Sequence, residues 1–115
     1  MSIDQLIARF AELGVAQDNA LLGNEIGRFN RLMDQMRTIV DELKGRLGDQ
    51  RHALCALYDH KNVQVRLQSA RLSLAVAPID ARKIIEAIAT SQQYPQAGHA
   101  RMTLWNLDRG VFKPT

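Results

Sequence analysis

The chain has 115 residues, of which 46% are hydrophobic and 23% are charged, and its formal net charge is +3. This length fits one domain, and the balance of apolar and charged residues excludes a disordered chain. No apolar stretch approaches the roughly 20 residues of a membrane span, and the N-terminus lacks the basic and apolar regions of a secretory signal. A reducing cytoplasm is the expected compartment.

The charge is divided unevenly along the chain. Residues 1–48 carry six basic and seven acidic side chains, whereas residues 49–115 carry nine and five, a surplus of +4. The C-terminal half is therefore the part expected to attract an anionic partner. The single cysteine, Cys55, has apolar neighbours and is expected to be a small buried residue; the alternative is an exposed, reactive thiol.

An amphipathic helix is predicted over residues 3–13. Its apolar residues fall three or four positions apart on one stripe: Ile3, Leu6, Ile7, Phe10 and Leu13. Ser2 and Gln5 have the spacing of a capping box at its start. Gly14 is expected to end the helix.

A second, longer helix is predicted from an N-cap at Asp18 to the glycines at positions 45 and 48, about 27 residues and about 40 Å long. Its apolar residues follow a heptad pattern: Leu22, Ile26, Phe29, Met33, Met36, Val40, Leu43 and Leu47. Leu32 and Ile39 widen the stripe, which favours a helix packed within its own domain over a coiled coil. A monomer is therefore expected, with a homodimer through the heptad face as the alternative.

Two glycines leave the shape of this long helix open. Gly23 and Gly27 lie four positions apart, and each disfavours a helix interior. They indicate either the close approach of another backbone or a break in the helix.

After Gly48 the pattern changes to shorter units. Helices are predicted over residues 49–58, 63–77, 79–91 and 96–107, separated by the polar turn 59–62, by Pro78 and by a turn at Tyr94 and Pro95. No segment alternates as a strand does. The sequence predicts an all-α domain over residues 1–115 with about six helices: N-terminal helices over 1–48, two hairpins over 49–110, and a tail whose Phe112 covers one end.

The two C-terminal hairpins resemble each other at an offset of 32 residues. Gln64 then aligns with Gln96, Val65 with Ala97, and Leu72 with Leu104. Helical hairpins of this length occur as solenoid repeats, and chance helical periodicity is the alternative.

The first hairpin resembles a HEAT repeat, in which a leucine-bearing helix runs into an aspartate turn, then Val-Arg, then a small residue. Asp59, Val65, Arg66 and Ala70 stand at the positions of that pattern. The second hairpin departs from it, because Gly98 replaces the arginine. The resemblance implies a HEAT-like stack of helical hairpins, and it implies a structural role for Arg66 in tying the turn at Asp59 to the following helix.

The chain as a whole resembles a small family of bacterial single-domain proteins of unknown function. The likeness is carried by residues 29–32, 62–66, 75–78 and 95–110. It implies a HEAT-like fold and no particular activity.

Basic side chains make nucleic-acid binding through the C-terminal half the alternative function. They are Arg51, Arg66, Arg71, Arg82, Lys83, Arg101, Arg109 and Lys113. Some HEAT-like proteins bind nucleic acid along a basic face, but here the charge surplus is small and the few aromatic residues are not interleaved with it. This function requires Arg51, Arg71, Arg82 and Arg101 to line one face.

No combination of residues indicates an enzyme, a cofactor or a metal. His52, His60 and His99 are scattered, and one cysteine adds little to them. No phosphate-binding glycine loop or nucleophile motif is present.

The favoured function is non-catalytic protein–protein interaction, as an adaptor or as an immunity-type protein that neutralises a toxin. Helical stacks offer preformed surfaces, here expected along residues 63–77 and 96–107, although this rests on analogy between folds. The candidate partner-binding residues are Arg66, Arg71, Arg101 and Trp105. Core packing is the default expectation for Trp105, and exposure would make it a candidate anchor for a partner.

Overall fold

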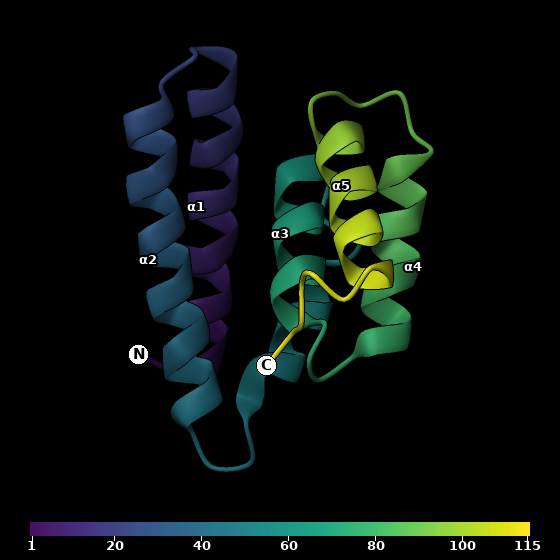
Figure 1. Cartoon of the computed structure of the whole chain (residues 1–115). Coiled ribbons are helices and arrows are strands. Elements are labelled where there is room, and N and C mark those ends of the chain that lie inside the picture. Colours follow the sequence, from purple (N-terminus) through teal and green to yellow (C-terminus); the bar gives the residue numbers. More distant parts are fainter. The chain divides into compact units, whose positions relative to one another are not determined.

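The computed structural model describes residues 1–115 and contains six helical segments and no strand (Figure 1). They are α1 (Ile3–Leu22), α2 (Ile26–Gly45), the 3-10 helix η1 (Gln50–Leu57), α3 (Val63–Ser73), α4 (Pro78–Ala89) and α5 (Gln96–Asp108). The predicted all-α class is confirmed. The chain forms two compact units, Met1–Ala53 and Leu54–Thr115, and the division falls inside η1. No helix combines the length and apolarity needed to cross a membrane.

The first helix begins as predicted and ends later. Ser2 accepts a hydrogen bond from the backbone N–H of Gln5, whose side chain accepts from the Ser2 N–H, so the capping box is formed. Gly14 does not end the helix; it is buried within it, and the helix continues to Leu22. A glycine in a helix interior costs only about 1 kcal/mol, which a buried apolar face readily offsets.

The predicted helix of about 27 residues is wrong, because the chain turns back after Leu22. Gly23 forms the C-cap of α1, and Asn24 takes the left-handed conformation with φ 54°. Asp18, predicted as an N-cap, therefore lies inside α1. The alternative of a break near the glycines is the correct one, and it leaves Leu22 and Ile26 exposed beside the turn.

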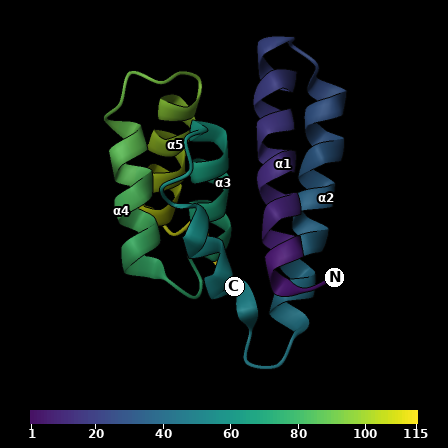
Figure 2. The same cartoon turned by 180° about the vertical axis from the view of Figure 1, so that it is seen from behind.

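α1 and α2 form an antiparallel pair (Figures 1 and 2). Much of the predicted heptad face is buried between them, at Met33, Met36, Val40 and Leu43. The two most enclosed of these, Met36 and Leu43, have no exposed surface. Half of the heptad residues are therefore covered within the chain, while Leu22, Ile26 and Leu47 are exposed.

η1 is a 3-10 helix instead of the predicted α-helix, and Asp49 precedes it with φ 50°. The Asp49 carboxylate accepts hydrogen bonds from the Arg51 backbone N–H and from its guanidinium, the shortest at 2.7 Å. The hydrogen bond from the Arg51 side chain lowers the pKa of Asp49. Arg51 is only 7% exposed, so its charge is held in this pair.

In the second unit α3 and α4 are antiparallel, and α5 packs against both (Figures 1 and 2). Asn62 caps α3 by accepting hydrogen bonds from the N–H groups of Gln64 and Val65. α3 was predicted to reach Ala77 but ends at Ser73. Proline disfavours the α conformation in the residue before it, and Ala77, which precedes Pro78, has φ −139° and ψ 60°.

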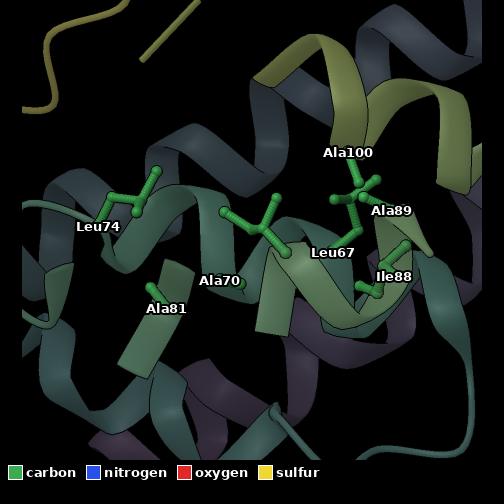
Figure 3. Packing of buried hydrophobic residues seen from close by; sticks show 8 residues of the cluster. Leu67, Ala70, Leu74, Ala81, Ile88, Ala89 and Ala100 are labelled. Carbon is green, nitrogen blue, oxygen red and sulfur yellow. The ribbon is translucent and has the colours of Figure 1, made fainter. Parts of the chain in front are cut away.

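The core of this unit is a cluster of buried apolar residues from all three helices (Figure 3). They are Leu67, Ala70, Leu74, Ala81, Ile85, Ile88, Ala89 and Ala100. Phe112 packs against the cluster as predicted, because the N–H groups of Val111 and Phe112 donate to the Asn106 carbonyl and fold the tail back.

Tyr58 gives this unit a pH-dependent stability. Its hydroxyl hydrogen-bonds Ser73, and burial, followed by a hydrogen bond with Cys55, raises its pKa. The folded state therefore keeps the phenol proton where the unfolded chain loses it, so the free energy of unfolding should fall as pH rises above about 10. Tyr58→Phe should show a weaker fall in denaturation experiments at several pH values. Tyr94→Phe is the control, and equal pH dependence of the two variants would contradict the assignment.

Candidate protein-interaction surface

The last helix carries its largest side chains on its outside. Residues spaced three or four apart form one stripe, named here the α5 outer face: Gly98, Arg101, Met102, Trp105, Asp108 and Arg109. All six are exposed, with Trp105 at 56% and Met102 at 52%. The opposite side of the helix is buried through the small residues Ala97, Ala100 and Thr103. The default expectation of a buried Trp105 is therefore wrong.

Two arginines of this face stack on aromatic rings. The Arg109 guanidinium lies 4.9 Å from the centre of the Trp105 ring, and that of Arg101 lies 5.6 Å from the centre of the Tyr94 ring. Arg101 also donates from Nε to the carbonyl of Ala89 at 2.9 Å. Neither guanidinium has a carboxylate partner. Both positive charges are thus held in place on the surface and remain unneutralised.

The acidic residue of the same face is already paired. Asp108 accepts two hydrogen bonds from Arg82 of α4, at 2.9 and 3.2 Å, and Arg82 also pairs with Glu86. The hydrogen bond from Arg82 lowers the pKa of Asp108. These contacts neutralise Arg82 and direct the charge of Asp108 toward α4.

Arg66 contacts the turn of its hairpin differently from the expectation. It donates to the backbone carbonyl of His60 at 2.7 Å and to the side-chain oxygen of Gln93 at 2.9 Å. The Asp59 carboxylate is exposed and does not pair with it. Arg66 therefore ties the 59–62 turn to α3 through a main-chain oxygen, and it adds a link to the loop before α5.

Arg71 is held by a residue of its own helix. It donates to the Gln68 side chain at 2.9 Å, whereas Arg101 donates to the carbonyl of Ala89 at the end of α4. Partial burial, followed by the charge of Arg71, lowers the pKa of His99. The two arginines therefore contact different elements.

The required basic face is not formed. Arg51 is buried against Asp49, Arg82 is paired with two acids, and Arg71 and Arg101 bond to different helices. α3 cannot share a binding surface with α5 as expected, because most of its residues are buried. Of the four candidate partner-binding residues, the structure brings together Arg101 and Trp105.

The sequence did not identify Tyr94 or Met102 as contributors to this surface, and it assigned Arg109 only to the possible nucleic-acid-binding set. The available signal was the spacing of Gly98, Met102, Trp105 and Arg109, which repeats four, three and four along one side of a helix. Because Leu104 and Leu107 neighbour Trp105 in the sequence, Trp105 was expected to lie on the buried, apolar side of the helix. Their side chains pack against the core cluster instead.

The offset of 32 residues has a geometric counterpart. Gln96 Nε2 donates to Gln64 Oε1 at 3.0 Å, so two equivalent and buried side chains touch. At the same offset, Met102 and Trp105 correspond to Ala70 and Ser73 of α3. Ala70 is covered within the core cluster and Ser73 is buried beside Tyr58. At the offset of 32 residues, the two positions that are buried on α3 therefore correspond to two positions that are exposed to solvent on α5.

Gly98 is the one residue of the α5 outer face that has no side chain. A Cβ atom built there meets nothing within 4 Å. Since alanine is favoured over glycine in helices by up to about 1 kcal/mol, Gly98→Ala should raise the free energy of unfolding by up to that amount. Gly110→Ala is the matched contrast, because Gly110 has φ +72° and alanine should lower stability there. Chemical denaturation of both variants checks the opposite signs, and a loss of stability in Gly98→Ala would contradict the open space seen at that position.

The remaining surface offers little further chemistry. No group of three or more His, Cys, Asp or Glu side chains could hold a metal ion. A shallow, largely apolar hollow of about 370 Å³ lies between Leu74, Pro78, Leu107 and Pro114, and Arg82 at its edge is paired with Asp108.

The arrangement is that of an all-helical protein of antiparallel helices with an exposed methionine and tryptophan on one side of its last helix. Residues 4–108 match the family described as a domain of unknown function (DUF2019), and the chain belongs to that family. The chain is similar to the protein RPA1889 from Rhodopseudomonas palustris CGA009, whose crystal structure gives a TM-score of 0.96 at 56% sequence identity over 100% of this chain and 95% of that chain. No match was found among curated proteins. The predicted likeness to a family of unknown function is confirmed.

Proposed function

We propose that this protein is a cytoplasmic, non-catalytic interaction module, an adaptor or an immunity-type protein, which binds a partner protein through the α5 outer face. The observation that carries the proposal is the exposure of Met102 and Trp105, each by more than half, on one side of one helix. Tryptophan and arginine are enriched at interface positions that contribute most to binding. Here Arg109 is already stacked on the Trp105 ring, so less freedom is lost on binding.

A HEAT-like hairpin stack is part of this proposal. Three features support it: the Gln64–Gln96 hydrogen bond at the repeat offset, the antiparallel order of α3, α4 and α5, and the bond from Arg66 to the preceding turn. Two features depart from a regular repeat, namely the 3-10 form of η1 and the glycine at position 98. An end unit with an unusual surface is typical of such stacks.

The experiment is quantitative affinity capture from lysate with the full chain, its Trp105→Ala variant and an Ile79→Ala control. Ile79 is an exposed apolar residue of α4, outside the α5 outer face. Loss of a central tryptophan should weaken binding by about 2 kcal/mol or more, whereas the control should bind as the unmodified chain does. Each capture is repeated after nuclease treatment. Equal recovery with Trp105→Ala would refute the proposed surface, and material lost on nuclease treatment would favour nucleic-acid binding instead.

A further inference from the structure

The α5 outer face has the position of a surface that a helix covers. In the first hairpin, Ala70 and Ser73 occupy the corresponding positions on α3 and are fully buried. Ala70 belongs to the cluster that includes Ile85 and Ile88 of α4. Ala70 is thus covered within a cluster that includes α4, and Ser73 lies beside Tyr58, whereas Met102 and Trp105 are exposed. An occupant that continued this packing over α5 would itself be a helix.

The charges of this unit favour an acidic occupant. Residues 54–115 carry eight basic and four acidic side chains. Arg101 and Arg109 lie at the edges of the apolar centre made by Met102 and Trp105, and neither has a carboxylate partner. Asp108, the one acid of the face, is neutralised by Arg82 and so does not repel a negative partner strongly. Complementary carboxylates would satisfy both arginines.

Gly98 sets the closest approach at one end of the face. A Cβ atom there would meet nothing within 4 Å, so the backbone of the first turn of α5 is uncovered at this position. A side chain or backbone of an incoming helix can lie directly on the glycine. A second copy of this chain is a poorer occupant, since pairing two α5 outer faces would bring together four arginines that lack carboxylate partners.

We propose that the α5 outer face binds an acidic amphipathic helix of a partner protein, laid along α5 with its apolar stripe on Met102 and Trp105 and its carboxylates on Arg101 and Arg109. This inference rests on the proposed function and names the class of partner. The helix-in-groove mode of recognition uses the same elements, apolar anchors at helical spacing with charges on either side.

The test uses a displayed library of helical peptides as long as α5. All members share one apolar stripe, and the flanking positions vary among glutamate, lysine, glutamine and serine. Selection on the immobilised full chain should enrich glutamate over lysine. A selected acidic peptide should bind about tenfold more weakly to the Arg101→Gln/Arg109→Gln double variant and about thirtyfold more weakly to Trp105→Ala. Added salt should weaken the binding to the unmodified chain.

Gly98→Phe places a bulky side chain on the uncovered backbone without changing either positive charge, and it should also weaken the selected peptide, whereas Ile79→Ala should not. Circular dichroism of each variant confirms that it is folded. Enrichment of lysine, no enrichment of either charge, or equal binding to Trp105→Ala would overturn the acidic-helix proposal. So would a concentration-dependent dimer that Trp105→Ala dissociates, since the occupant would then be a second copy. Each of these outcomes can occur while lysate capture remains dependent on Trp105, so the two proposals fail separately.

Discussion

Replacing Phe10 by alanine should lower the free energy of unfolding by about 3–5 kcal/mol, the usual cost of removing a buried aromatic side chain. Phe10 lies at the centre of the apolar side of α1 and has no exposed surface. Removing the ring takes away its transfer energy and leaves a cavity between two helices that cannot collapse freely.

Chemical denaturation followed by circular dichroism measures this loss. Leu22→Ala is the control on the same helix, because Leu22 is 81% exposed and its truncation should change stability by less than about 0.5 kcal/mol. If the two variants lost similar amounts of stability, the packing of α1 against α2 would not be as described.

Ile85→Ala should lower the free energy of unfolding by about 2–5 kcal/mol. Ile85 is fully buried in the cluster that joins α3, α4 and α5, together with Leu67 and Ile88. Ile85→Val removes one methylene and should cost about 0.5–1.5 kcal/mol, so the two variants give a graded series at one position.

Ile79→Ala, on the exposed side of the same helix, is the control for Ile85 as well. The expected order of destabilisation is Ile85→Ala, then Ile85→Val, then Ile79→Ala. A cost below about 1 kcal/mol for Ile85→Ala would mean that the cluster relaxes around the cavity, and it would contradict close packing at this site.

The fold was predictable from sequence where a local signal acts alone. The capping box at Ser2 and the break between two helices at Pro78 each depend on a few neighbouring residues; the capping box is confirmed, and α4 begins at Pro78, one residue before the predicted start. Helix ends that depend on tertiary packing were not predictable. Gly14 and Gly23 are the same residue type, yet the first lies inside α1 and the second caps it. The difference is that residues after Gly14, such as Gln17 and Ala20, are still buried on the packed side of α1.

The long-helix prediction failed for a related reason. The alternation of four and three continues from Leu22 to Ile26 although the chain reverses direction between them. A heptad pattern records which residues face a partner, and two antiparallel helices that face each other produce the same pattern as one helix. Periodicity therefore identified most of the core of this unit without locating the turn within it.

The candidate surface was predictable in part. Arg101 and Trp105 were identified as candidates, but the sequence could not show that Arg66 bonds to the turn at His60 and Arg71 to Gln68 of its own helix. Whether a large side chain on a terminal helix is buried depends on what packs over that helix, and nothing in the local sequence around Trp105 reports this. The contrast between Ala70 and Met102, equivalent positions with opposite exposure, is visible only once the helices are placed.

The contact between Gln64 and Gln96 has a meaning in terms of symmetry. A primary amide both donates and accepts hydrogen bonds, so one glutamine can satisfy another without any difference between the two. Two buried lysines or two buried glutamates in the same places would repel each other, and a complementary pair would need two different residues. A self-complementary side chain thus lets the same residue type serve on both sides of the contact between α3 and α5.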